Sequence, residues 1–478
     1  MTRKILLGLC LILSTYIIRA QELETQLGAN YNHDPELIEI DLMTRAGVRW
    51  VRVTPRFFRY LNGELDPATD EGLQHIIDAS NAGYNVVFGF RFDFHQHERI
   101  PVPNSQRERE MFDVIGAVIA RIGQHIDIFT LGNEPNLEAV QADMIYQDSH
   151  GGVPLVVFTQ RLLDEVVAPF YDRRPSFKRP EIYGGSIPAI FQTSTQNNEA
   201  VKGLLQMAQD DDRIAGFDLH FHIESFDEVD AGFQFARSIM PEKPFLITEF
   251  SLHRLYRSKI DEQLGVTQAG IDFAEQYGYD PTWESYRWYT VVNSNKVKPD
   301  EFQAFFDSRE WYPDNYLKLF REKFNEYGVF LATYPILQQS APQVLNSTSP
   351  LWFINPVYMQ VSLVPEADGQ LGANPLCETD YLDWAAYRLP LGELFETIDD
   401  TIQIFPNPSA GIFTISRNEL IGDVQVTVHS LEGKKLFDQR FSEETIAMDL
   451  SKLKSGMYQL TITANQEVYS KRIFIESN

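Results

Sequence analysis

Two glutamates that end hydrophobic runs are the residues of this chain best suited to chemistry. Glu134 follows the run Phe129–Gly132 and Asn133, and Glu249 follows the run Phe245–Thr248. If both runs are strands of one parallel sheet, the two carboxylates emerge at the same edge of that sheet. Paired carboxylates can cleave a glycosidic bond, because one protonates the leaving oxygen while the other attacks the anomeric carbon. For either glutamate alone, a solvated strand end is the alternative.

The elements that must position these residues alternate along the chain from about Glu24 to Pro356. Short apolar or β-branched runs are followed by longer amphipathic stretches, the pattern of a parallel sheet covered by helices. Eight such runs fit a closed (β/α)8 TIM barrel better than an open sheet. The expected strands are Glu24–Ala29, Val48–Val53, Asn85–Phe92, Ile126–Gly132, Glu181–Gly185, Gly216–His222, Pro244–Phe250 and Leu351–Asn355.

The interval 251–350 separates the last two expected strands and is too long for a loop and one helix. We therefore expect an insertion that stands at the C-terminal face of the barrel, with a helix over Asp314–Tyr327. Its tryptophans, Trp283, Trp288 and Trp311, either pack a core of the insertion itself or bind substrate beyond the reacting sugar.

The glutamate motifs resemble those of glycoside hydrolase clan A, in which an Asn-Glu pair ends the fourth strand and a glutamate ends the seventh. Here the pair is Asn133-Glu134 and the second glutamate is Glu249, and the resemblance covers most of the range from Glu24 to Pro356. It implies a retaining glycosidase that needs no cofactor. In that interpretation Glu134 is the acid/base, Glu249 is the nucleophile, and Asn133 binds substrate.

Two further strands carry residues that the resemblance places near the nucleophile. Arg52, within Gly47–Val53, matches an arginine that helps to hold the nucleophile ionised, although an ordinary surface ion pair is the alternative. His220 and His222 share one face of the sixth expected strand. Many clan members have His-x-Tyr there, so His222 puts the tyrosine's role in doubt. The two histidines could instead bind a metal, but no third ligand at metal spacing is evident, and we expect none.

Three more residues are expected to line the sugar subsites. Trp352, on the eighth expected strand, matches the aromatic floor that the clan often places under the sugar, with packing in the barrel core as the alternative. Arg91 follows the third expected strand and Tyr31 the first, so both fall at the correct end of the barrel.

After Glu393 the sequence changes character. The segment 403–478 shows short alternating strands separated by turn signals, which predicts a small antiparallel sandwich. Its motifs Phe405-Pro406-Asn407-Pro408 and Ser455-Gly456-Met457-Tyr458 resemble the type A C-terminal sorting domain of the type IX secretion system of Bacteroidetes. The resemblance implies that the secretion machinery binds this tail and delivers the protein outside the cell or to its surface. A small carbohydrate-binding or immunoglobulin-like module is the alternative.

The first residues resemble a secretory signal peptide. Arg3 and Lys4 precede the apolar run Ile5–Ile18, and Ala20 stands before a polar stretch. The predicted organisation is thus a signal peptide (1–20), a barrel domain (21–393) with its insertion (251–350), a linker (394–402) and a sorting domain (403–478). The apolar run Ile5–Ile18 is shorter than the about 20 apolar residues that a transmembrane span needs, and no later run comes close.

The formal net charge of -26 limits the possible partners. Nucleic acids and anionic membranes require a positive surface, so we expect neither as a partner. A polysaccharide or oligosaccharide fits the charge. A surface protein that binds glycan without cleaving it is the alternative function, and a missing carboxylate would favour it. Both glutamates are present.

Overall fold

The computed structural model describes residues 24–339, 344–366, 369–386, 402–405, 409, 411–417, 424–429, 435–442, 445–454, 456–464 and 467–475. It divides into two compact units, Met1–Arg388 and Leu389–Asn478, and each is described by itself. The predicted signal peptide lies outside the described residues, as does the predicted linker apart from Ile402.

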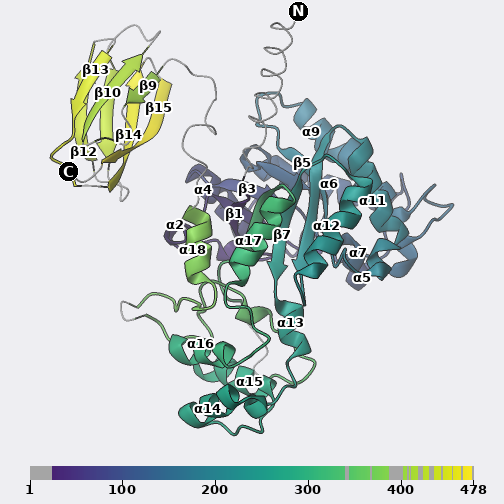
Figure 1. Cartoon of the computed structure of the whole chain (residues 1–478). Coiled ribbons are helices and arrows are strands. Elements are labelled where there is room, and N and C mark those ends of the chain that lie inside the picture. Colours follow the sequence, from purple (N-terminus) through teal and green to yellow (C-terminus); the bar gives the residue numbers. More distant parts are fainter. Residues whose placement is uncertain are drawn as a thin grey trace, which may run out of the picture. The chain divides into compact units, whose positions relative to one another are not determined.

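Eight parallel strands of the first unit pair in chain order and close into a barrel (Figure 1). The closure is made where β8 pairs with both β7 and β1. The predicted (β/α)8 barrel is therefore confirmed. The strands are β1 (Gln26–Asn30), β2 (Trp50–Val53), β3 (Asn85–Phe88), β4 (Ile128–Thr130), β5 (Glu181–Pro188), β6 (Ile214–His222), β7 (Phe245–Ser251) and β8 (Val329–Pro335).

The position predicted for the eighth strand is wrong. Val329–Pro335 closes the barrel, whereas Leu351–Asn355 surrounds the short helix η6 (Trp352–Ile354), which comes after the closure. Both segments are short apolar runs, so the local pattern could not separate them. The interval between β7 and β8 is consequently 252–328, and Trp352 does not lie on a strand.

Amphipathic helices surround the barrel. On α4 the residues Leu73 and Ile76 are fully buried, as the three-and-four spacing predicts, and Asp70 caps the first turn by accepting from the Leu73 N–H. The main helices of this layer are α2 (Ile40–Arg45), α4 (Glu71–Asn81), α6 (Gln106–Ile122), α8 (Pro154–Arg161), η4 (Leu162–Val167), α9 (Ala168–Asp172), α11 (Glu199–Asp210), α12 (Asp227–Ile239), α17 (Tyr316–Glu326) and α18 (Glu378–Ala386). Shorter helical turns are η1 (Pro35–Leu37), α3 (Phe57–Leu61), α5 (Phe94–His97), η2 (Gly123–His125), α7 (Pro135–Glu138), η3 (Gln141–Met144) and α10 (Thr193–Gln196).

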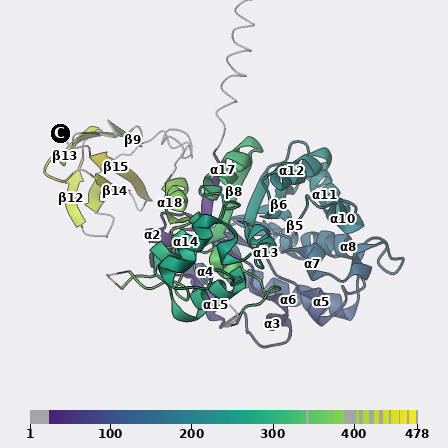
Figure 2. The same ribbon diagram turned by 60° about the horizontal axis from the view of Figure 1, so that its bottom comes forward.

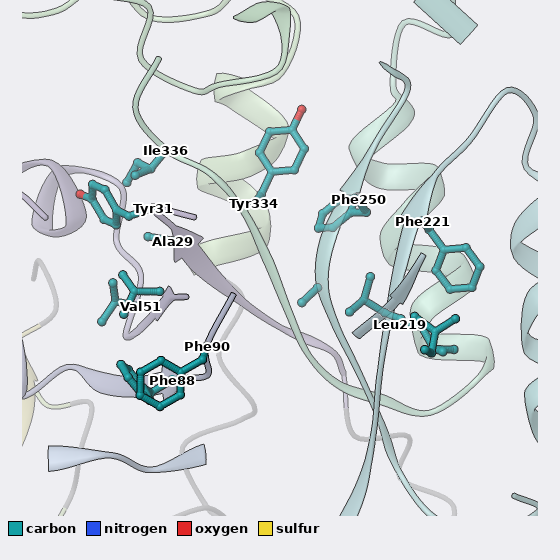
Figure 3. Packing of buried hydrophobic residues seen from close by; sticks show 14 of the residues in the cluster. Ala29, Tyr31, Val51, Phe88, Phe90, Leu219, Phe221, Phe250, Tyr334 and Ile336 are labelled. Atoms are coloured by element: carbon teal, nitrogen blue, oxygen red, sulfur yellow. The ribbon is translucent and has the colours of Figure 1, made fainter. Parts of the chain in front are cut away.

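Apolar side chains from the strands and the segments that follow them fill the core. Figure 3 shows Ala29, Val51, Leu219 and Phe250 among them, all between 0 and 1% exposed. Toward the C-terminal ends of the strands the buried residues become polar, and these are Asn30, Arg52, Asn133, Asp218, His220 and Thr248. Buried polar groups need hydrogen-bonding partners, so this polar layer is the expected place of a functional site.

The insertion forms a helical group of its own (Figure 1, Figure 2). Its elements are α13 (His253–Ser258), η5 (Leu264–Val266), α14 (Gln268–Tyr277), α15 (Ser285–Asn295) and α16 (Pro299–Asp307). Trp288 is fully buried and stacks on Phe305, with ring centroids 3.8 Å apart and planes at 12°. Trp283 and Trp311 are partly buried against the same core. Trp288 is therefore a core residue of the insertion and does not bind substrate.

The second unit contains two antiparallel sheets. One has the order β13-β10-β9 and the other the order β12-β11-β14-β15. Buried residues of both sheets, among them Phe413, Val426 and Leu460, form one apolar core. The predicted small β domain is confirmed. Its strands are β9 (Ile402–Phe405), β10 (Ile412–Arg417), β11 (Val424–His429), β12 (Lys435–Phe441), β13 (Thr445–Asp449), β14 (Gly456–Ala464) and β15 (Glu467–Ile475).

Within the part of the chain that the structure describes, none of the helices combines the length and the hydropathy needed to cross a bilayer.

The burial of Trp288 predicts a large effect on stability. Trp288→Ala should lower the free energy of unfolding by about 3–5 kcal/mol, because it leaves a cavity in the insertion's core. Tyr146→Ala is the control, since Tyr146 is 60% exposed, and it should change the value by about 0.5 kcal/mol or less. Urea unfolding measures both. Equal effects of the two substitutions would contradict the placement of Trp288 in a core.

Candidate active site

Glu134 and Glu249 lie at the C-terminal ends of β4 and β7, as the sequence predicts. One carboxylate oxygen of each belongs to a group of atoms that all lie within 4.8 Å of one another. Both side chains remain accessible, with 20% and 18% of their surface exposed. Glu134 has a φ of 39°, a left-handed conformation that residues with a side chain adopt only when the surroundings impose it. The chain thus places two reachable carboxylates face to face.

Arg52 connects the two strand ends that carry the glutamates. Its guanidinium, only 1% exposed, donates from Nη1 to Oε1 of Glu249 over 2.5 Å. The other terminal nitrogen, Nη2, donates to Oδ1 of Asn133 over 2.6 Å, and Nη1 also lies 3.3 Å from Oδ1 of Asn30. The interaction that the resemblance implied is therefore a buried contact and not a surface ion pair.

A third carboxylate, Glu138, holds the other end of the Asn133 amide. Asn133 donates from Nδ2 to Oε1 of Glu138 over 2.8 Å, and Oε2 of Glu138 accepts from the backbone N–H of Phe92 over 2.8 Å. Burial raises the pKa of the Glu138 carboxyl to about 8. Glu138 was not predicted from the sequence. The available signal was a glutamate one helical turn after the acid/base candidate, within the same strand-end segment.

His220 lies between the two carboxylates and is fully buried. Its Nδ1 is 3.2 Å from Oε1 of Glu134 and 4.0 Å from Oε2 of Glu249. Its Nε2 is 3.0 Å from the hydroxyl oxygen of Thr248, and that hydroxyl donates to Asp218. Thr248 and Asp218 fix the ring from behind, and sequence reasoning missed both, because strand pairing brings them together and no local motif marks them.

His222 lies beside the nucleophile candidate. Its Nε2 is 3.5 Å from Oε2 of Glu249, and its Nδ1 is 2.8 Å from the hydroxyl oxygen of Ser251. The residue that stands in the tyrosine's place therefore faces the same carboxylate. Ser251 was not identified from the sequence.

The charges around Glu249 decide its protonation. Burial alone would raise the pKa of this carboxyl, but His220 and Arg52, with a hydrogen bond from His222, outweigh burial and hold the pKa well below its usual range. Burial likewise would lower the pKa of His220, but Glu249, Glu134 and Asp218 raise it above its ordinary value. The site thus stabilises a negative charge on Glu249.

Trp352 lies at the site, but on the short helix η6 and not on the strand predicted from the sequence. The segment after β8 brings its ring to a centroid distance of 4.7 Å from His222, at an interplanar angle of 72°. The same ring stacks on His253, with a centroid distance of 3.4 Å and an angle of 8°. With 47% of its surface exposed, the indole is an accessible aromatic face next to His222.

Arg91 and Tyr31 are not brought into contact with the paired carboxylates. Among the described residues, Arg91 donates to Asp93 over 2.7 Å, contacts His33 and lies 3.8 Å from Glu138. The ring of Tyr31 is 2% exposed, and its hydroxyl bonds the backbone of Glu39. Burial raises the pKa of Tyr31, and Figure 3 shows its ring beside Ile336. Arg91 therefore borders the site, whereas Tyr31 packs in the core.

A cation could also find ligands here. Glu134, His220, His222 and Glu249 each offer one ligand atom to the group that lies within 4.8 Å. The sequence showed only the two histidines as a pair, because the carboxylates come from two other strands.

Residues 403–476 match the family model described as a secretion system C-terminal sorting domain. The sorting tail predicted from the sequence is thereby confirmed. No curated protein matches the chain.

Several solved structures are similar to the chain at low identity. An endo-beta-1,4-mannanase double mutant of Cellulomonas fimi is 12% identical with a TM-score of 0.41, over 96% of this chain and 95% of that one. A family 39 glycoside hydrolase of Bacteroides cellulosilyticus WH2 is 10% identical with a TM-score of 0.40, over 93% and 82%. An FMN-binding beta-glucuronidase of Facaelibacterium prausnitzii L2-6 is 10% identical with a TM-score of 0.39, over 95% of this chain, which spans 56% of that protein's length.

Removal of the Arg52 guanidinium should raise the pKa of the Glu249 carboxyl, since one of the charges that hold it ionised is lost. In Arg52→Gln we expect kcat/KM on an activated aryl glycoside to fall about 100-fold, because the carboxylate also loses its orientation. If Glu249 is the nucleophile, it must be ionised to attack, so a higher pKa of its carboxyl moves the acidic limb of the pH profile to higher pH.

Two further variants serve as controls for this measurement. Arg52→Lys keeps the positive charge and should move the limb less. Arg121→Gln, at an exposed arginine of α6, should leave the profile unchanged. If the acidic limb of Arg52→Gln stays where it is in the parent, the guanidinium does not control Glu249.

Proposed function

We propose that the chain is a secreted or cell-surface retaining glycoside hydrolase that cleaves β-glycosidic bonds of a polysaccharide or oligosaccharide. The observation that carries the proposal is the approach of Glu134 and Glu249, each of which has a carboxylate oxygen in a group of atoms that lie within 4.8 Å of one another. Retaining glycosidases hold their carboxyl groups about 5–5.5 Å apart, whereas inverting enzymes need about 6.5–9.5 Å to admit a water. The narrow spacing supports direct attack on the sugar.

In this mechanism Glu249 is the nucleophile. Its low pKa and its bond to Arg52 keep the carboxylate ionised and oriented. Oε2, the oxygen that is not bonded to Arg52, attacks the anomeric carbon as the bond to the leaving oxygen breaks. The product of this step is a covalent glycosyl-enzyme.

Glu134 is the acid in the first step and the base in the second. It gives its proton to the leaving oxygen and then takes a proton from the water that attacks the glycosyl-enzyme. His220, 3.2 Å from Oε1 of Glu134, holds the carboxyl in place during both transfers. The second step restores Glu249 and releases a sugar of retained configuration.

Trp352, Asn133 and Arg91 are proposed to serve the substrate rather than the proton transfers. The exposed indole face beside His222 suits the C–H face of the reacting sugar. Asn133 adjoins the nucleophile through Arg52, and Arg91 borders the site through Glu138. The reaction as written uses no cofactor.

A glycan-binding surface protein without catalysis is the second candidate. Such a protein has no need for an ionised carboxylate paired with a buried guanidinium and opposed by a second carboxylate. Burial of the Arg52 charge costs free energy that binding alone does not require, so the pair favours the enzyme.

The sorting domain supports a further proposal on how the protein is exported. We propose that residues 1–20 are a removed signal peptide, that 21–393 form the enzyme, and that 403–478 engage the type IX secretion machinery. The substrate is then a glycan outside the cell, and the formal charge of -26 speaks against nucleic acid.

Azide rescue tests the two carboxylates separately. After a panel of polysaccharides and aryl β-glycosides has identified a substrate, Glu249→Ala should lose at least about 1,000-fold in kcat. Azide should restore some turnover with a product of inverted configuration, because the small anion enters the space of the lost carboxylate.

Glu134→Ala should still form the glycosyl-enzyme from an activated aryl glycoside but release it slowly, since the base is missing. Azide should then give a glycosyl azide of retained configuration. Glu181→Ala is the control, at the exposed first residue of β5 and thus at the opposite end of the barrel. Full activity in either active-site variant would refute the assignment.

A further inference from the structure

The side chains around the paired carboxylates also have the composition of a transition-metal site. Glu134, His220, His222 and Glu249 supply two imidazole nitrogens and two carboxylate oxygens. This is a ligand set that Zn²⁺ binds readily. We propose that the cluster is a divalent-cation site of the zinc class, and that a bound cation inhibits the enzyme because it occupies the place of the reacting sugar. The inhibitory part rests on the function proposed above.

The spacing of the ligand atoms supports the site. Zinc bonds of about 2.0–2.2 Å in a tetrahedron put neighbouring ligand atoms about 3.3–3.5 Å apart. Nδ1 of His220 lies 3.2 Å from Oε1 of Glu134, and Nε2 of His222 lies 3.5 Å from Oε2 of Glu249. Nδ1 of His220 and Oε2 of Glu249 are 4.0 Å apart. Of the six edges of the tetrahedron, two are thus close to the required length and a third is about 0.5 Å longer. All four ligand atoms lie within 4.8 Å, so a bound cation would draw the remaining ones inward.

The two carboxylate oxygens of Glu249 have different contacts. Oε1 accepts from Arg52, whereas Oε2 faces both histidines. A cation can therefore take Oε2 while the guanidinium stays on Oε1. The nearby positive charge of Arg52 opposes a second cation, which suits a reversibly bound inhibitor better than a permanent metal.

The outer nitrogens of both histidines already have the partners that metal-bound histidines need. Nε2 of His220 contacts the Thr248 hydroxyl, and Nδ1 of His222 contacts the Ser251 hydroxyl. Each hydroxyl oxygen has two acceptor lone pairs and can accept the remaining ring N–H. Thr248 directs its own O–H to Asp218, and Ser251 accepts one backbone N–H, that of His253. Such outer contacts orient the ring and strengthen it as a ligand.

Cation and substrate exclude each other in this arrangement. The anomeric carbon must lie between Glu134 and Glu249 for the reaction, and the cation needs the same oxygens. Inhibition by the cation should accordingly be competitive with the glycoside and reversed by a chelator.

Calorimetry with zinc chloride alone on the mature chain tests the site without need of a substrate. We expect one Zn²⁺ per chain, and no binding of Mg²⁺, which prefers an all-oxygen site. His222→Gln and Glu249→Gln should each weaken Zn²⁺ binding at least ten-fold, with the fold of each variant verified by circular dichroism. His125→Asn, at a half-buried histidine in η2 before β4, is the matched control and should bind like the parent.

The outcomes separate this proposal from the proposed function. Absence of stoichiometric binding, or an undiminished affinity in both ligand variants, would overturn the cation site and leave the hydrolase untouched. If a chelator abolishes hydrolysis and Zn²⁺ restores it, the cation is catalytic and its inhibitory role is overturned. A protein that binds Zn²⁺ with the expected dependence on His222 but cleaves no glycoside would support the site and remove the proposed function.

Discussion

The buried guanidinium of Arg52 is the constraint on which the rest of the site depends. A charge that is 1% exposed must be paired, because an unpaired buried charge costs several kcal/mol. Arg52 on β2 meets this requirement with Glu249 on β7, Asn133 after β4 and Asn30 on β1. Four strand ends from around the barrel are thereby held at fixed positions. Closure of the barrel brings these strand ends together, and the buried charge of Arg52 requires them to stay in contact.

The distribution of charge follows from that pairing. Arg52 and His220 together offset the burial of Glu249 and hold its pKa low. Asn133 accepts a hydrogen bond from Arg52 and donates one to Glu138. Burial raises the pKa of the Glu138 carboxyl to about 8. The pKa values of the Glu249 and Glu138 carboxyls therefore move in opposite directions because their surroundings differ.

Site residues that stand at strand ends could be predicted from the sequence. The segment that closes the barrel could not. Glu134, Glu249 and Arg52 could be predicted because each ends or occupies a hydrophobic run, and a barrel gathers such ends at one face. The last strand was misplaced because Val329–Pro335 and Leu351–Asn355 look alike locally, and only pairing with β1 distinguishes them. Trp352 was expected on the eighth strand, but it contacts His222 from a segment that follows the closure of the barrel. Thr248 and Ser251 were missed because their contacts with His220 and His222 arise from the pairing of β6 with β7, which no single segment encodes. Glu138 is different, since it contacts Asn133 within one strand-end segment, and that local signal was overlooked.

The configuration of the first product tests the central claim most directly. Proton NMR of a freshly started reaction resolves the anomeric signal before mutarotation mixes the two forms. Direct attack by Glu249 across the narrow gap predicts that the β-anomer is released first from a β-linked substrate. First release of the α-anomer would contradict the account, because it requires a water between the carboxylates and removes the covalent role of Glu249.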